Sequence, residues 1–156
     1  MSDSLFSVLA VLLLLSGPCG RQTTTPKSPW SLELTTSGGF AGIGRGNLSV
    51  DSEGKFNYYG RSAQKVRQGC ESKFTPKQLQ PIKDAVAKSH PREWNKPGLN
   101  IAAPDAFGYK LELQTNGQKY TVEWYDNTSD QLPADLKRLN EVLLQTMQTA
   151  CKPSTP

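Results

Sequence analysis

Residues 107–124 read FGYKLELQTNGQKYTVEW and contain the clearest structural signal in this chain. Apolar and polar residues alternate on both sides of Asn116-Gly117, which is the strongest short signal for a tight β-hairpin turn. Such alternation places the apolar side chains on one face of each strand, and that face is then buried. We therefore predict an antiparallel hairpin in which Phe107 begins the first strand and Trp124 points into the core beside Val122.

Further strands and two helices are expected on either side of this hairpin. The same alternation predicts strands over 30–36 and 47–51, with a third short strand over 55–59. The order ββ(β)-α-ββ-α belongs to the α+β class. The expected architecture is an antiparallel sheet of four to five strands with two helices packed on one face.

The two helices have recognisable starts. Thr75-Pro76-Lys77-Gln78 combines an N-cap residue, a proline at the first helical position and a capping-box glutamine. Pro81 conflicts with this start because it removes a backbone donor in the second turn, so a helix that begins at Pro81 is the alternative. Leu132-Pro133 precedes the second helix, whose leucines recur at helical spacing.

The chain is predicted to carry an export signal at its N-terminus. Residues 5–15 form an unbroken apolar block, shorter than the about 20 residues that span a bilayer. Small residues follow it, as in a signal-peptide cleavage region, although no Lys or Arg precedes it; a buried N-terminal strand is the alternative. We expect a signal peptide over 1–20, a flexible tether over 21–29 and one globular domain over 30–152, in a secreted or periplasmic protein.

The three cysteines fit the expectation that the protein is exported. Cys19 stands where a bacterial lipoprotein carries its lipidated cysteine, but Pro18 is a poor residue directly before such a site. If Cys19 is lipidated or removed, Cys70 and Cys151 remain as a pair, which suggests a disulfide in an oxidising compartment. Contact with a membrane is expected only through a lipid anchor at Cys19 or an uncleaved signal.

A second distinctive segment is the glycine loop, residues 37–46, with the sequence SGGFAGIGRG. Its five glycines allow positive φ angles and close backbone approach, at an entropic cost to folding. One interpretation is that the loop presents Phe40, with Ile43 second, as an exposed apolar plug. The other is that Phe40 belongs to the core and that the glycines serve a bulged strand connection.

Three features together resemble emfourin, the proteinaceous inhibitor family of protealysin-type, thermolysin-family metalloproteases found in bacteria. They are the string SGGFAGI from Ser37, the segment PDAFGY from Pro104 with its hairpin, and the final Leu132-Pro133 helix. The resemblance covers roughly residues 31–148. The export signal, the tether, the two later cysteines and a longer middle connection are departures from the family pattern.

This resemblance implies a protease inhibitor that occludes the active-site cleft of a thermolysin-like zinc enzyme. Such clefts have an apolar pocket beside the metal that prefers Phe, Leu or Ile, so Phe40 is the candidate anchor and Arg45 would meet acidic groups at the rim. Trp94, in the irregular segment 92–101, is either a second exposed contact or a lid over the edge of the core. The candidate protease contacts are Gly38, Gly39, Phe40, Ala41, Gly42, Ile43, Arg45 and Trp94.

Other functions receive less support from the sequence. The formal net charge is +4, but the basic residues are dispersed, whereas a nucleic-acid binder would show a clustered basic stripe. His90 is the only histidine and lacks the H-E-x-x-H partner, and no cysteine spacing suits zinc. We therefore expect no enzyme activity, bound metal, cofactor or nucleic-acid partner. The alternative function is an exported envelope interaction module with the same fold and no inhibitory activity.

Overall fold

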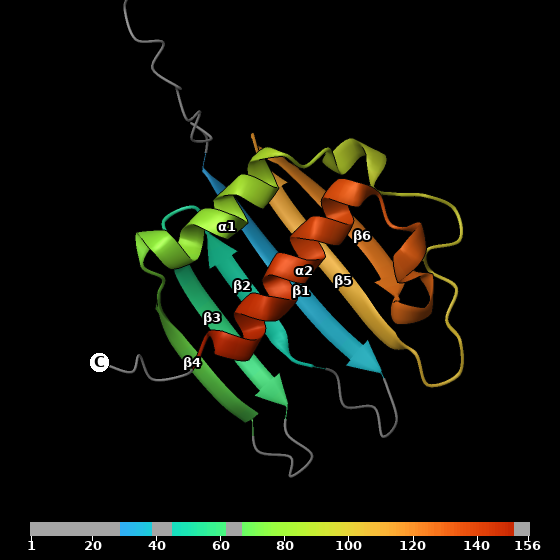
Figure 1. Ribbon diagram of the computed structural model, residues 1–156, viewed down its shortest axis with the longest axis horizontal. Helices are drawn as coiled ribbons and strands as arrows, with labels where there is room; N and C mark the ends of the chain where they lie inside the picture. The colour runs from blue at the N-terminus through green and yellow to red at the C-terminus, as the bar shows by residue number, and fades with distance from the viewer. Residues whose placement is uncertain (1–28, 39–44, 62–66, 152–156) are drawn as a thin grey trace, which may run out of the picture.

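The computed structural model describes residues 29–38, 45–61 and 67–151, so the predictions for the signal peptide and for Cys19 lie outside the described residues. Within the described part, one antiparallel sheet of six strands is covered on one face by two α-helices (Figure 1). The elements in chain order are β1 (Trp30–Gly38), β2 (Asn47–Asp51), β3 (Lys55–Arg61), β4 (Arg67–Lys73), α1 (Pro76–Ala87), η2 (Pro91–Glu93), β5 (Phe107–Thr115), β6 (Gln118–Tyr125), η3 (Asp126–Gln131) and α2 (Ala134–Thr149).

The α+β class predicted from the sequence is confirmed, and the strand order is β4-β3-β2-β1-β5-β6. β1 lies in the interior of the sheet, where Leu34 faces Leu48 of β2 on one side and Leu111 of β5 on the other. All three side chains are fully buried, because alternate residues of each strand point toward the helices. β1 therefore joins the N-terminal strands to the predicted hairpin.

The hairpin of β5 and β6 is confirmed. Thr115 pairs with Gln118 across the turn, and Asn116 and Gly117 have φ angles of 52° and 72°. Two successive positive φ angles define the type I′ turn that matches the twist of the strands. Trp124 is 1% exposed, as expected from the alternation, and its ring stacks on that of Tyr109 at 5.3 Å between ring centroids.

The sheet has more strands than the four to five predicted, because β4 is also a strand. β4 pairs with β3 along its whole length, and Tyr58 faces Cys70 in this register. The sequence of β4, RQGCESK, shows no apolar alternation: Cys70 is its one apolar side chain, and it packs against the core. An edge strand that contributes a single apolar side chain leaves no periodic signal.

Helix α1 begins at Pro76, so the alternative start at Pro81 is wrong. The capping box at its start is confirmed: Gln78 N–H donates to Thr75 Oγ1 at 3.4 Å, and Gln78 Oε1 accepts from Thr75 N–H at 2.9 Å. Pro81 lies within the helix and is exposed. The helix tolerates it because the proline costs one intrahelical hydrogen bond near the N-terminus, where the cap already holds the first turn.

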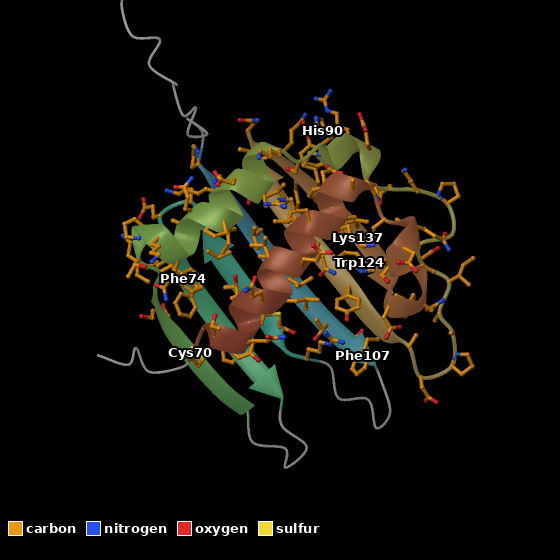
Figure 2. All side chains as sticks on the ribbon, viewed as in Figure 1. Cys70, Phe74, His90, Phe107, Trp124 and Lys137 are labelled. Atoms are coloured by element: carbon orange, nitrogen blue, oxygen red, sulfur yellow. A yellow bond between two sulfur atoms is a disulfide. The ribbon has the colours of Figure 1, made fainter. Side chains whose placement is uncertain are left out.

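The predicted disulfide is also confirmed. Cys70 of β4 is bonded to Cys151, which follows α2, across 81 residues of sequence. Figure 2 shows Cys70 at the edge of the sheet, near the C-terminal end of α2. The bond therefore ties the edge strand to the last helix.

The core lies between the helices and the sheet face that they cover. Its larger buried side chains from the sheet are Trp30, Leu32, Leu34, Leu48, Val50, Phe56, Tyr109, Leu111, Leu113, Val122 and Trp124, and those from the two helices are Leu79, Ile82, Val86, Leu136, Leu139, Leu143 and Met147.

Candidate functional site

The candidate contacts of the glycine loop fall into two groups. Gly39, Phe40, Ala41, Gly42 and Ile43 lie outside the described residues, and their role as protease contacts stays a prediction. Gly38, at the end of β1, and Arg45, just before β2, are described. With their neighbours they form what we call the loop base: Thr36, Gly38, Arg45, Gly46, Tyr58 and Phe107.

The centre of the loop base is a pair of residues that join the two ends of the loop. The Thr36 hydroxyl donates to the carbonyl oxygen of Gly46 at 2.8 Å and accepts from the Gly46 N–H at 2.8 Å. The Thr36 N–H donates to the same carbonyl at 3.1 Å. Thr36 is 4% exposed, so these bonds are made away from competing water. The end of β1 and the residue before β2 are thereby joined at a fixed point.

Both glycines of the loop base are required by geometry. Gly38 has φ +80°, and a Cβ there would lie 2.7 Å from the Ala106 carbonyl oxygen. Gly46 has φ +118°, and a Cβ there would overlap the Tyr59 carbonyl oxygen. Since side-chain-bearing residues rarely adopt these angles and would also collide, glycine is the one residue type that fits either position. The glycines therefore set how the chain leaves β1 and enters β2.

Arg45 is exposed but held against the same end of the sheet. Its guanidinium carbon lies 5.4 Å from the centroid of the Phe107 ring, within the range of a cation–π interaction. Its carbonyl oxygen accepts from the Tyr58 hydroxyl at 3.3 Å. None of the ion pairs among the described residues involves Arg45. Its charge is therefore positioned and remains available to an acidic group of a partner.

These contacts place the loop base at one end of the sheet. Gly38 pairs with Phe107 at the start of β5, and Thr35 pairs with Asn47 at the start of β2. Figure 2 shows Phe107 at this end, below the C-terminal half of β1, and His90 at the opposite end.

Trp94 does not belong to this site. Its side chain is 1% exposed, and its indole Nε1–H donates to Asp135 Oδ2 at 3.0 Å. Leu99, further along the same connection, is 2% exposed. The hydrogen bond to the first turn of α2 draws the ring over the edge of the core, so the lid interpretation of Trp94 is correct. Trp94 therefore offers no side-chain surface to a partner protein.

The Asp135 carboxylate also organises the turn around His90. It accepts from the His90 N–H at 2.6 Å, and His90 Nδ1 lies 3.7 Å away. Burial favours the neutral acid, but the hydrogen bonds from the His90 N–H and Trp94 outweigh it and lower the pKa of Asp135. Cys70 is disulfide-bonded and so offers His90 no free thiol. These contacts fix the turn at His90 and the Trp94 ring against the first turn of α2.

Among the described residues no element covers the sheet face away from the helices, and the residues that line its middle are mostly polar. Its middle holds a shallow hollow of about 390 Å³, lined among others by Ser31, Glu33, Ser49 and Asn57. At one side Glu112 accepts from Lys119 at 2.7 Å and from Lys110 at 2.9 Å, and these two contacts lower its pKa. The charges of this face are therefore partly neutralised by one another.

One apolar feature of the connection before β5 has no counterpart in the sequence predictions. Ile101 is 64% exposed, the highest value among the exposed large hydrophobic side chains of the described residues. Its position depends on hydrogen bonds from η3, more than 20 residues away in the sequence, so no local pattern could have indicated it.

Comparison with known proteins adds no family to this description. No protein-family model matches the chain, and a search of curated proteins found no significant match. Across residues 29–38, 45–61 and 67–151, no three His, Cys, Asp or Glu side chains are grouped to hold a metal ion. In the same residues no helix has the length and apolar character needed to cross a membrane.

Proposed function

We propose that this protein is a proteinaceous inhibitor of thermolysin-like, protealysin-type zinc metalloproteases, and that it occludes their active-site cleft. The observation that carries the proposal is the buried pair of Thr36 and Gly46, which closes the glycine loop on a strand in the interior of the sheet. A loop fixed at its base loses less conformational entropy on binding than a free segment, and this loss is a main cost of association. The emfourin-like sequence of the same loop supports the choice of partner.

In this proposal Phe40 is the anchor that enters the apolar pocket beside the partner's zinc. Gly39, Ala41 and Gly42 let the backbone approach the cleft, and Ile43 is the second apolar contact. Gly38 and Arg45 stand at the two described ends of the loop, and Arg45 offers a positive charge to the cleft rim. The metal belongs to the protease, so the inhibitor needs no cofactor of its own.

Resistance to cleavage would come from the same geometry. A peptide bond is cut when the enzyme can draw the substrate backbone into an extended, reactive conformation. The two hydrogen bonds of the Thr36 side chain at 2.8 Å oppose that extension by holding the loop ends together. The disulfide between Cys70 and Cys151 stabilises the fold outside the cell, where we place the protein, with Cys19 a candidate for lipid attachment.

The proposal is tested by titrating a thermolysin-like metalloprotease with the purified chain and following hydrolysis of a peptide substrate. We expect activity to fall in proportion to the added chain, while a serine protease in the same buffer is unaffected. Full activity at a large molar excess of the chain would remove the inhibitor proposal.

The anchor is tested by Phe40→Ala in the same assay. Loss of inhibition at an unchanged melting temperature supports the anchor role. A loss of stability of about 3–5 kcal/mol, as found for buried aromatic residues, would instead assign Phe40 to the core.

A second function, an exported interaction module without inhibitory activity, is favoured by the uncovered polar face of the sheet. Its hollow and its mixed charges offer hydrogen bonds to a polar partner. The titration separates the two functions, because a module that binds through this face leaves the protease active.

A further inference from the structure

A short apolar segment, residues 101–104 with the sequence IAAP, is held out to solvent. All four residues are exposed, and Ile101 is 64% exposed. The other exposed large hydrophobic residue of the described part is Tyr59, at 50%, which has a polar hydroxyl. Singly exposed aliphatic residues are common, but this one is held outward by a fixed backbone, and covering it would be favourable.

The cause of this outward position is a set of hydrogen bonds from η3. The Asn127 side chain binds the segment twice: its Nδ2 donates to the Ile101 carbonyl at 3.0 Å, and its Oδ1 accepts from the Ala103 N–H at 3.3 Å. Just before the segment, the Leu99 carbonyl accepts from the buried Thr128 hydroxyl at 2.7 Å. The backbone is thereby fixed while the Ile101 side chain stays free of the core.

The far end of the segment is fixed as well. The Ala106 N–H donates to the Ala103 carbonyl at 3.2 Å, and the Phe107 N–H donates to Asp126 Oδ1 at 3.2 Å. Asp105 between them has φ +62°, a conformation that few non-glycine residues adopt. The segment is therefore held at both ends in one outward conformation.

This segment leads directly into the loop base. Phe107 pairs with Gly38, and Arg45 lies over the Phe107 ring at 5.4 Å. The Ala106 carbonyl is the group that a Cβ on Gly38 would strike. The segment and the two ends of the glycine loop thus lie at the same end of the sheet, and one partner can touch both.

We propose that Ile101, with Ala102, Ala103 and Pro104, is a second contact element that packs on an apolar rim of the same metalloprotease cleft. This inference rests on the proposed function. The protease is the favoured occupant because the segment is continuous with the loop base and carries no charge. Its fixed backbone also keeps the entropy cost of binding low. Asn127 is a positioning residue that acts through the segment.

Ile101→Asp tests the contact, with Asn116→Asp as the matched control. Both changes place one carboxylate at an exposed site, but Asn116 lies in the β5–β6 turn at the opposite end of the sheet. Aspartate tolerates the positive φ of that turn. We expect the inhibition constant to rise roughly tenfold or more for Ile101→Asp and to stay within about twofold for Asn116→Asp, with both melting temperatures preserved.

The outcomes of this test are distinct. An unchanged inhibition constant for Ile101→Asp overturns the second contact and leaves the proposed function standing, since the parent chain still inhibits. A parent chain that does not inhibit overturns both. If Ile101→Asp dissolves a dimer of the chain in sedimentation measurements while inhibition is unchanged, the segment binds a second copy and the proposal is wrong.

The positioning role of Asn127 is tested by a double-mutant cycle with Ile101→Asp. Asn127→Ala alone is expected to weaken inhibition and to speed amide exchange at Ala103, whose N–H loses its partner. In the Ile101→Asp background the same change should have little further effect on inhibition, because the contact that it positions is already lost. Additive effects would show that Asn127 does not act through this segment.

Discussion

The pair of Thr36 and Gly46 makes the sharpest prediction about how the fold serves the glycine loop. Thr36→Val keeps the shape of the side chain and removes both hydrogen bonds of the hydroxyl. The Gly46 carbonyl keeps the Thr36 N–H as a donor at 3.1 Å, but the buried Gly46 N–H is left without this partner. Most of the lost stability therefore comes from one buried backbone donor, the Gly46 N–H, that has no hydrogen-bond partner in the variant.

The size of the effect follows from these contacts. An unsatisfied buried donor costs about 1–3 kcal/mol, and the second lost hydrogen bond adds about 1 kcal/mol. Burial of the methyl group that replaces the hydroxyl stabilises the variant by about 0.8 kcal/mol. We expect a net loss of about 2 kcal/mol in the free energy of unfolding, which is the sum of these terms.

The same change should weaken inhibition, because binding must then close the loop base again. Since every 1.4 kcal/mol is a factor of ten, the inhibition constant should rise between about tenfold and thirtyfold. The assays are urea denaturation and protease titration at a temperature where the variant is fully folded. Thr146→Val is the control: it removes a similar hydroxyl bond of 2.8 Å, to Val142 within α2, and should leave inhibition unchanged.

Two results would refute this reasoning. A stability loss of about 2 kcal/mol with unchanged inhibition would mean that the pair of Thr36 and Gly46 matters only for folding. Unchanged stability would mean that the hydroxyl bonds are not made in the folded protein.

Three further predictions concern the fold that carries the loop. Gly46→Ala should destabilise the protein by at least about 1 kcal/mol more than Gly117→Ala. Both sites have positive φ, but a Cβ at Gly46 would overlap the Tyr59 carbonyl oxygen, whereas one at Gly117 meets no atom within 4 Å. Equal losses of stability in urea denaturation would exclude the close approach at Gly46. Replacing Cys70 and Cys151 by serine should lower the unfolding free energy by about 4.5 kcal/mol, the chain-entropy value for a separation of 81 residues. An unchanged urea midpoint would contradict this. Because the pKa of Asp135 is lowered in the folded protein, its charge stabilises the fold above the ordinary carboxylate pKa of about 3.9. This contribution is lost as pH falls through the lower folded-state pKa. Asp135→Asn should therefore lose less stability than the parent chain between pH 7 and pH 3. Parallel pH profiles of the two proteins would contradict the role of the Asp135 charge.

Elements with a local signal could be predicted from the sequence. The β5–β6 hairpin follows from strict alternation around Asn116-Gly117, and α1 follows from the capping box at Thr75. Local rules failed where a single long-range contact decides the structure. In β4, Cys70 packs against the core, and it is held by a disulfide to Cys151, which follows α2.

In the candidate site, too, features with a local sequence signal could be predicted and features set by long-range contacts could not. The two ends of the glycine loop are visible in the sequence because Gly38 and Gly46 have positive φ angles and approach other backbone atoms closely. The bonds between Thr36 and Gly46 were not predicted, since Thr36 looks like an ordinary strand residue until the pairing of β1 and β2 is known. The sequence left both interpretations of Trp94 open for a similar reason: its burial depends on Asp135, which is 41 residues away.

The most direct test of cleft occlusion is competition with a small inhibitor that binds the zinc and fills the adjacent apolar pocket of the same protease. The measurement is the dissociation constant of the protein for the protease at increasing concentrations of this compound. If the glycine loop occupies the pocket, the two ligands exclude each other and the apparent dissociation constant rises in proportion to the compound. A constant that does not change would place the protein away from the active site and contradict the proposed mechanism.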